Sequence, residues 1–195
     1  MLEVWQSNVR GELATVLSRL EALPLESTAQ PELIVLRART LTAVGRGAEA
    51  ITQLDALARK SPQDVDLAMT LADLLAKEGR PAAARAVLDR VRPFVTGPRA
   101  RSALFQTEAT LWMQEERWGR ALDSLQTAAR IEPGVPHLHY RLAECLERMG
   151  SLHSALDEVR KGRVLDSPAG AKAQDAWVDR LEAAMTQAIV PLDGP

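Results

Sequence analysis

A spacing of 34 residues recurs along this chain and constrains its fold more than any other feature. The segments RLEAL at residues 19–23, QLDAL at 53–57 and VLDRV at 87–91 lie 34 residues apart. SLQTA begins 37 residues later at Ser124, and EVRKG a further 34 residues on at Glu158. A step that recurs in this way predicts copies of one supersecondary unit, each burying its apolar face against its neighbours.

Five positions of the repeating unit carry the same kind of residue from copy to copy. Positions eight and twenty are alanine in all four copies, and positions eleven, fifteen and twenty-four are leucine, glycine and leucine in three of them. With position one at Pro31, Val65, Ser102 and Pro136, the residues at positions eight, fifteen and twenty are Ala38, Gly45 and Ala50; Ala72, Gly79 and Ala84; Ala109, Glu116 and Ala121; and Ala143, Gly150 and Ala155. Three extra residues, 99–101, separate the second copy from the third, and we expect them to lengthen the loop there.

Each unit is predicted to be two helices joined by a turn. In the first helix, positions four, seven, eight and eleven follow the spacing of an amphipathic helix. Glycine at position fifteen suits the end of that helix because it adopts a positive φ without a Cβ clash. Alanine at position twenty allows the second helix to approach closely, and Pro62 and Pro133 close their units because proline cannot continue a helix. Residues 61–64, Ser-Pro-Gln-Asp, are interpreted as a capping box that opens the next unit.

This pattern resembles the tetratricopeptide repeat family, whose 34-residue unit has small residues at positions eight and twenty and proline near position thirty-two. The resemblance implies an all-α fold, a right-handed superhelix (α-solenoid) of antiparallel helix pairs. Arg37 and Glu108 occupy a position that is usually apolar, and Glu116 replaces glycine, without changing the register. The four full repeats are expected at residues 31–64, 65–98, 102–135 and 136–169.

We expect a single domain over residues 1–195, closed at both ends. Residues 1–30 are expected to form an N-terminal half-repeat or one long helix. Residues 170–190 carry Trp177 and Leu181 on one face and are expected to form a capping helix over the last repeat.

The resemblance also implies a partner-binding groove, because the first helix of each repeat lines the inner surface in this family. Met69, Met113 and Tyr140 are expected to be apolar anchors for a bound peptide or helix. The predicted groove residues are Val35, Arg39, Met69, Asp73, Gln106, Thr110, Met113, His137, Tyr140 and Glu144.

One subgroup of the family grips the acidic tails of heat-shock chaperones with a clamp of five Lys, Arg and Asn residues. The positions that correspond, counted from the second repeat, are Met69, Asp73, Thr107, His137 and Arg141. One suitable arginine does not make a clamp, so we predict no binding of such chaperone tails.

Composition argues against several other classes of function. The net charge is −2, so no basic field points to nucleic acid. No run of apolar residues is long enough for membrane insertion, and the start of the chain lacks the pattern of a secretory signal, so a cytoplasmic location is expected. One cysteine, Cys145, excludes a disulfide within the chain.

No catalytic, cofactor or metal site is predicted. His137 and His139 are two residues apart on a helix and point to different faces, so they cannot share a metal ion. No phosphate loop, nucleophile elbow or dinucleotide fingerprint occurs.

We therefore predict a non-enzymatic adaptor, assembly factor or chaperone that holds a peptide or helix of a partner protein. Two alternatives stay open. One is a regulatory segment of a larger bacterial enzyme such as a sulfotransferase or hydroxylase, and the other is a scaffold that forms homo-oligomers.

Overall fold

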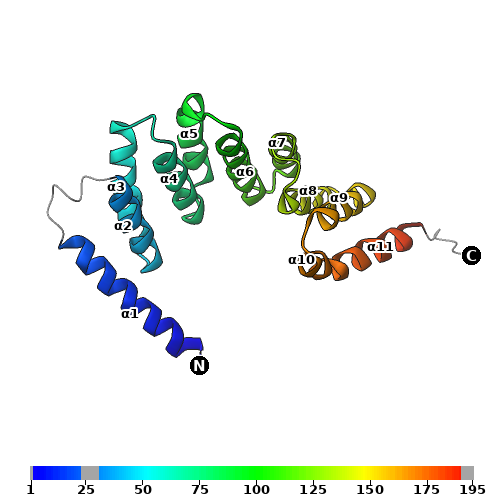
Figure 1. Cartoon of the computed structure of the whole chain (residues 1–195), viewed down its shortest axis with the longest axis horizontal. Coiled ribbons are helices and arrows are strands. Elements are labelled where there is room, and N and C mark those ends of the chain that lie inside the picture. The colour runs from blue at the N-terminus through cyan, green and yellow to red at the C-terminus, as the bar shows by residue number, and fades with distance from the viewer. Residues whose placement is uncertain (1, 23–30, 190–195) are drawn as a thin grey trace, which may run out of the picture. The chain divides into compact units, whose positions relative to one another are not determined.

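The computed structural model describes residues 2–22 and 31–189, and the regular elements in these two ranges are all helices, with no strand. They are α1 (Leu2–Glu21), α2 (Pro31–Ala43), α3 (Gly47–Lys60), α4 (Val65–Lys77), α5 (Pro81–Val91), the 3-10 turn η2 (Arg92–Phe94), α6 (Pro98–Gln114), α7 (Trp118–Ile131), α8 (Pro136–Arg148), α9 (Leu152–Leu165), α10 (Pro168–Ala173) and α11 (Asp175–Ile189). The all-α prediction is confirmed (Figure 1).

The chain divides into two compact units, residues 1–95 and residues 96–195. In the first unit α1 packs on α2, and α2 to α5 each pack on the next helix along the chain. In the second unit α6 to α9 do the same, and α9 contacts both α10 and α11. The predicted helix pairs are α2 with α3, α4 with α5, α6 with α7, and α8 with α9. That residues 1–195 form a single domain stays a prediction.

The alanines at positions eight and twenty lie at the centres of these pairs. All eight are 0 % exposed: Ala38, Ala50, Ala72, Ala84, Ala109, Ala121, Ala143 and Ala155. In the second unit the two alanines of each repeat belong to the same core cluster. Ala109 and Ala121 share a cluster with Leu125 and Leu138, formed by α6, α7 and α8. Ala143 and Ala155 share another with Val159 and Leu181, formed by α8, α9 and α11. A methyl group is small enough for two helix backbones to approach closely, so these positions set the packing of each pair.

Each pair turns at position fifteen with a positive φ. The angles are +86° at Gly45, +68° at Gly79, +56° at Glu116 and +78° at Gly150. The next residue donates its N–H to the carbonyl five residues back, as Arg117 does to Trp112 at 2.8 Å, which is the hydrogen bond of a Schellman motif. Glu116 therefore adopts the conformation that its repeat requires, although an L-residue pays for it with a Cβ contact.

The extra residues 99–101 lengthen a helix and not a loop. α6 begins at Pro98 and runs for 17 residues, whereas α2, α4 and α8 have 13. Gly97, at a φ of +84°, precedes the proline at the first helical position. Proline fits there because its missing N–H would have no helical partner, so the segment Arg99–Ala100–Arg101 forms part of the first turn.

The predicted capping box at residues 61–64 is wrong about which residue is the N-cap of the following helix. Asp64 is the N-cap of α4, and its Oδ1 accepts the N–H of Leu67 at 3.0 Å. Ser61 is instead the C-cap of α3. An N-cap side chain accepts a hydrogen bond from the backbone N–H two or three residues later, inside the helix. For Asp64 that residue is Leu67, within α4, whereas three residues after Ser61 the chain has not yet entered the helix.

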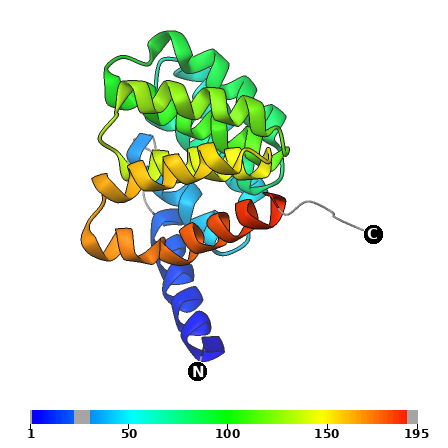
Figure 2. The same ribbon diagram turned by 90° about the vertical axis from the view of Figure 1, so that its right-hand side faces the viewer.

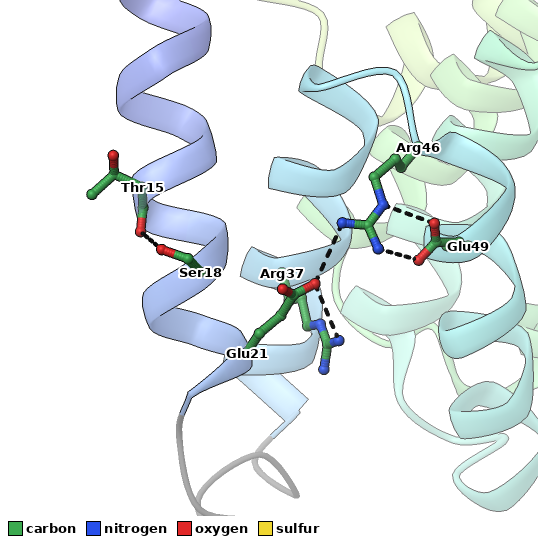
Figure 3. A network of polar contacts seen from close by, with 6 residues as sticks. All are labelled: Thr15, Ser18, Glu21, Arg37, Arg46 and Glu49. Carbon is green, nitrogen blue, oxygen red and sulfur yellow. Dashed lines mark hydrogen bonds and ion pairs between the residues drawn. The ribbon is translucent and has the colours of Figure 1, made fainter.

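The N-terminal region forms one long helix, α1, over the described part of residues 1–30. Leu17 and Leu20 are buried where α1 packs on α2. Glu21 Oε1 lies 3.8 Å from Nη2 of Arg37 on α2 and 3.4 Å from Nη1 of Arg46 (Figure 3). Arg46 also donates to both carboxylate oxygens of Glu49. The side chains of these ion pairs are exposed or half-buried, and each pair adds little stability, so the two leucines hold α1 in place.

The C-terminal region has two helices where the sequence predicted one. α10 ends at Ala173 and α11 begins at Asp175, so the single residue Gln174 separates the two helices (orange and red in Figure 2). Arg163 of α9 contacts Asp175, the first residue of α11, with 2.6 Å between Nη2 and Oδ1. Val178 and Leu181 then pack on the α8–α9 core, which gives α11 the capping role expected for residues 170–190.

A polar contact joins α8 to α9 inside the last repeat. His139 Nδ1 lies 2.7 Å from Glu158 Oε2, and Lys161 donates to the other carboxylate oxygen at 2.7 Å. Burial raises the pKa of the Glu158 carboxyl, but these hydrogen bonds and the charge of Lys161 outweigh it, so the pKa lies below its ordinary value.

Among the helices of residues 2–22 and 31–189, none combines the length and the apolar composition that a membrane span needs.

Replacing Glu116 by glycine is expected to stabilise the protein, because the left-handed conformation costs an L-residue more than it costs glycine. Part of the gain is offset by the greater freedom of glycine in the unfolded chain, which leaves about 0.5–1 kcal/mol in the free energy of unfolding. Urea unfolding followed by circular dichroism measures it. Glu116→Ala, which also removes the carboxylate but keeps the Cβ, should give no such gain; an equal gain would contradict the backbone explanation.

Replacing Glu158 by glutamine is expected to lower stability at neutral pH, with a deficit that shrinks in acid. The pKa of Glu158 is depressed by folding, so its ionised form stabilises the fold above the ordinary value of 4.5, and this contribution disappears as the pH falls through the lowered value. Thermal unfolding of both proteins from neutral pH downwards provides the comparison. Asp157→Asn, one residue away on the exposed face, is the control; a deficit for Glu158→Gln that does not change with pH would refute the assignment.

Candidate partner-binding site

The ten predicted groove residues all lie on the first helices of the repeats, and none of them is fully buried. In the first unit, α2 carries Val35 and Arg39, and α4 carries Met69 and Asp73. α2 and α4 contact each other, so these four residues belong to neighbouring helices, and Asp73 also pairs with Lys77 at 2.8 Å. In the second unit, α6 carries Gln106, Thr110 and Met113, and α8 carries His137, Tyr140 and Glu144. That the two sets form one groove stays a prediction.

In the second unit, Arg141 brings several of the predicted residues together. Its guanidinium donates to Thr110 Oγ1 at 2.7 Å, to the Gln106 carbonyl at 3.3 Å and to Met113 Sδ at 3.3 Å. His137 Nε2 lies 2.8 Å from Gln106 Oε1 beside this network. These contacts cross from α8 to α6 and fix the spacing of the two helices on this face.

Arg141 was missed as a site residue because it entered the sequence argument only as one member of an incomplete chaperone clamp. Burial lowers the pKa of its guanidinium, and the neighbouring Cys145 and Glu144 act in the opposite direction. An arginine keeps its charge under such shifts. Arg141 is therefore a half-buried fixed cation whose stem supports the surface formed by α6 and α8.

An open cleft of about 640 Å³ lies between α8 and α11 in the second unit. It contains two of the predicted residues, Tyr140 and Glu144. The other lining residues were not predicted as site residues: Arg141, Glu147, Arg148, Trp177 and Arg180.

The walls of this cleft are held by hydrogen bonds. Tyr140 donates its hydroxyl to Asp166 Oδ2 at 2.9 Å, and burial, together with the hydrogen bond and the charge of Asp166, raises the pKa of Tyr140 to about 12. Tyr140 also packs against Gly162, where an added Cβ would lie 2.5 Å from the ring. The tyrosine is thus a neutral, fixed aromatic wall.

The opposite wall comes from α11. Trp177 Nε1 donates to Glu147 Oε2 at 2.7 Å, and Arg180 donates to both oxygens of Glu147 at 2.9 and 3.1 Å. The sequence pattern placed Trp177 on the packing face of the capping helix, and it gave no role to Arg180. Both residues lie one turn apart on α11, so they reach α8 together while Leu181 packs in the core.

The cleft carries more positive than negative charge. Arg141, Arg148 and Arg180 line it together with Glu144 and Glu147. Glu147 is neutralised by Arg180, and Arg148 lies over the ring of Trp118 at 5.1 Å from its centroid. The chemistry available is recognition: aromatic walls for an apolar side chain, and guanidinium groups for a carboxylate.

His137, His139 and Cys145 have structural surroundings. His137 and His139 contact Gln106 and Glu158, respectively, and no group of three His, Cys, Asp or Glu side chains suited to a metal ion occurs in the part of the chain that the structure describes. Cys145 is buried at 0 % exposure, and burial raises the pKa of its thiol to about 11. A thiol of that kind carries little thiolate at neutral pH.

Known proteins share parts of this sequence pattern and of this fold. Residues 41–104 match the family model described as tetratricopeptide repeat. No protein with a curated description matches the chain.

Among solved structures, a MamA fragment from Desulfovibrio magneticus RS-1 is similar at 17% identity and a TM-score of 0.67, covering 88% of this chain and 96% of that one. A tetratricopeptide-repeat protein from Thermus thermophilus has 22% identity and a TM-score of 0.61, with 94% of each chain covered. Yeast Tom70 has 18% identity and a TM-score of 0.69, and the match spans 85% of this chain but 35% of Tom70. At these identities the likeness is one of fold.

The spacing of alanines and positive-φ turns, the matched segment 41–104 and the shared fold agree: residues 41–104 match the tetratricopeptide repeat, and the described helix pairs from α2 to α9 have the fold of that repeat.

Proposed function

We propose that this protein is an interaction module that binds a peptide or short helix of a partner protein against the first helices of its repeats. The observation that carries the proposal is the cleft between α8 and α11, where Tyr140 and Glu144 meet Trp177 and three arginines. The finer description, a non-enzymatic adaptor, assembly factor or chaperone that works in the cytoplasm of a bacterial cell, is part of this proposal.

The shape of the cleft supports a peptide as its occupant. The cleft is open to solvent, and its volume of about 640 Å³ lies within the range of ligand sites. Tyr140 and Trp177 are held by hydrogen bonds before any partner arrives. Fixed aromatic walls lose little entropy on binding, which favours them as anchors at an interface.

The charges of the cleft support a partner segment that carries a carboxylate. Glu147 is already paired with Arg180, so Arg148 at the exposed edge is the cation best placed for an incoming acidic group. Arg148 also lies over Trp118, which holds its guanidinium near one orientation. The expected ligand is a short segment with an acidic residue next to an apolar or aromatic one.

Reversing the charge of Arg148 is expected to abolish most of this binding. Peptides are selected from a random phage-displayed library on the full chain, and their affinities are then measured by fluorescence anisotropy on purified variants. For peptides that bind in the cleft, Arg148→Glu should weaken affinity roughly tenfold, because it replaces an attraction by a repulsion close to the ligand. Glu144→Lys should tighten the same peptides.

Arg130→Glu is the matched control, because Arg130 is exposed on α7, a second helix of a repeat, and undergoes the same charge change. Circular dichroism checks that each variant is folded. If every selected peptide binds Arg148→Glu and wild type with equal affinity, the cleft is not the binding site and the proposal is wrong.

A further inference from the structure

The first unit has a hollow surface of its own, formed by the second helices of its two repeats, α3 and α5. One hollow of about 590 Å³ lies between α3 and α5, with residues of α4 at its base, and a smaller one of about 160 Å³ adjoins it. The two hollows share the lining residues Arg59, Val87 and Arg90, and together they are named the α3–α5 groove. The helices that bound it can be followed in Figure 1.

The base of the α3–α5 groove is apolar and its walls are small. Ile51, Leu71 and Val87 form the base, each less than a tenth exposed. Ala56 of α3 and Ala86 of α5 are exposed and line the groove from its two helices. Alanine walls leave room for a larger apolar side chain, which would bury the exposed alanine methyl groups and the small part of Ile51 that solvent reaches.

The edges of the groove are basic. Arg59, Arg80 and Arg90 lie along it, and Asp55 is the acidic residue that lines it. Asp55 is already engaged, at 2.8 Å from Arg59 and 3.8 Å from Arg90. The groove therefore presents net positive charge around an apolar base, although the whole chain has a net charge of −2.

We propose that the α3–α5 groove binds an amphipathic helix of a partner protein whose apolar stripe is flanked by acidic residues. An apolar stripe matches the base, and carboxylates beside it match the arginines at the edges. The lining residues of α3 run from Ile51 to Arg59, which corresponds to about two turns of helix. Nucleic acid fits this surface less well, because its phosphates would meet the arginines while the apolar base stayed uncovered.

This surface is distinct from the one proposed above for the first helices. Its walls belong to α3 and α5, whereas the predicted groove residues of the first unit lie on α2 and α4. A protein with both surfaces could join two partner segments at once.

The test uses three designed helical peptides of about 14 residues with the full chain. The first has leucines along one stripe and glutamates beside them; the second replaces the glutamates by lysines; the third replaces the leucines by alanines. Fluorescence anisotropy gives each affinity, and ¹⁵N chemical-shift mapping locates the bound peptide. We expect the first peptide alone to bind and to shift the resonances of α3 and α5.

Two variants with matched controls test the groove itself. Ala86→Gln places a longer side chain in the groove, while Ala82→Gln makes the same change at an exposed alanine of α5 that does not line it. Arg80→Gln combined with Arg90→Gln removes edge charge, and Arg101→Gln is an exposed control on α6. Ala86→Gln and the double arginine variant should each weaken the acidic peptide roughly fivefold, and the controls should not.

The proposal is overturned if the acidic peptide fails to bind, or if Ala86→Gln and Ala82→Gln bind it equally. It is also overturned if the lysine peptide binds as well as the acidic one, or if a single-stranded RNA oligonucleotide displaces the acidic peptide from α3 and α5. Arg148→Glu should leave this binding unchanged, so failure here is distinguishable from failure of the cleft in the second unit.

Discussion

The close approach of two helices at a pair of alanines is the contact on which the rest of the structure depends. Positions eight and twenty hold alanine in all four repeats, and every one of these side chains is fully buried. A larger side chain at either position would push the two backbones apart, and the leucines that surround the contact would lose their packing. Because each pair has this small contact at its centre, its larger apolar residues are free to pack against the next pair.

The same arrangement decides where function can lie. Residues of the first helices that do not face a neighbour remain accessible, and in the second unit they meet a capping helix that supplies Trp177 and Arg180. The cleft thus exists because α11 packs on α9 through Leu181 while its polar face reaches α8. A fixed scaffold with a partly charged, partly aromatic hollow is suited to binding a partner segment.

The fold was largely predictable from sequence, and the candidate site was not. Alanine and glycine recur at fixed positions because backbone geometry admits few other residues there, so Ala121 and Gly150 could be assigned from spacing alone. Glu116 stands where the other three repeats have glycine, and it adopts the positive φ that this position requires. The site depends on contacts between residues far apart in the chain, such as Glu147 with Trp177, and a repeat pattern holds no information about them. The interruption between α10 and α11 escaped prediction for the same reason, since Arg163 and Asp175 meet only in the folded chain.

Hydrogen exchange on an Ala121→Leu variant tests most directly whether the alanine contact holds each pair together. Ala109 and Ala121 share one core cluster, so the account predicts that the larger side chain costs about 1–3 kcal/mol and lowers the protection of amides in both α6 and α7. Ala103→Leu makes the same substitution on the exposed face of α6 and should leave protection unchanged. Unaltered protection in α6 and α7 of Ala121→Leu would contradict the account, because the helix pair would then not depend on the small residue at its centre.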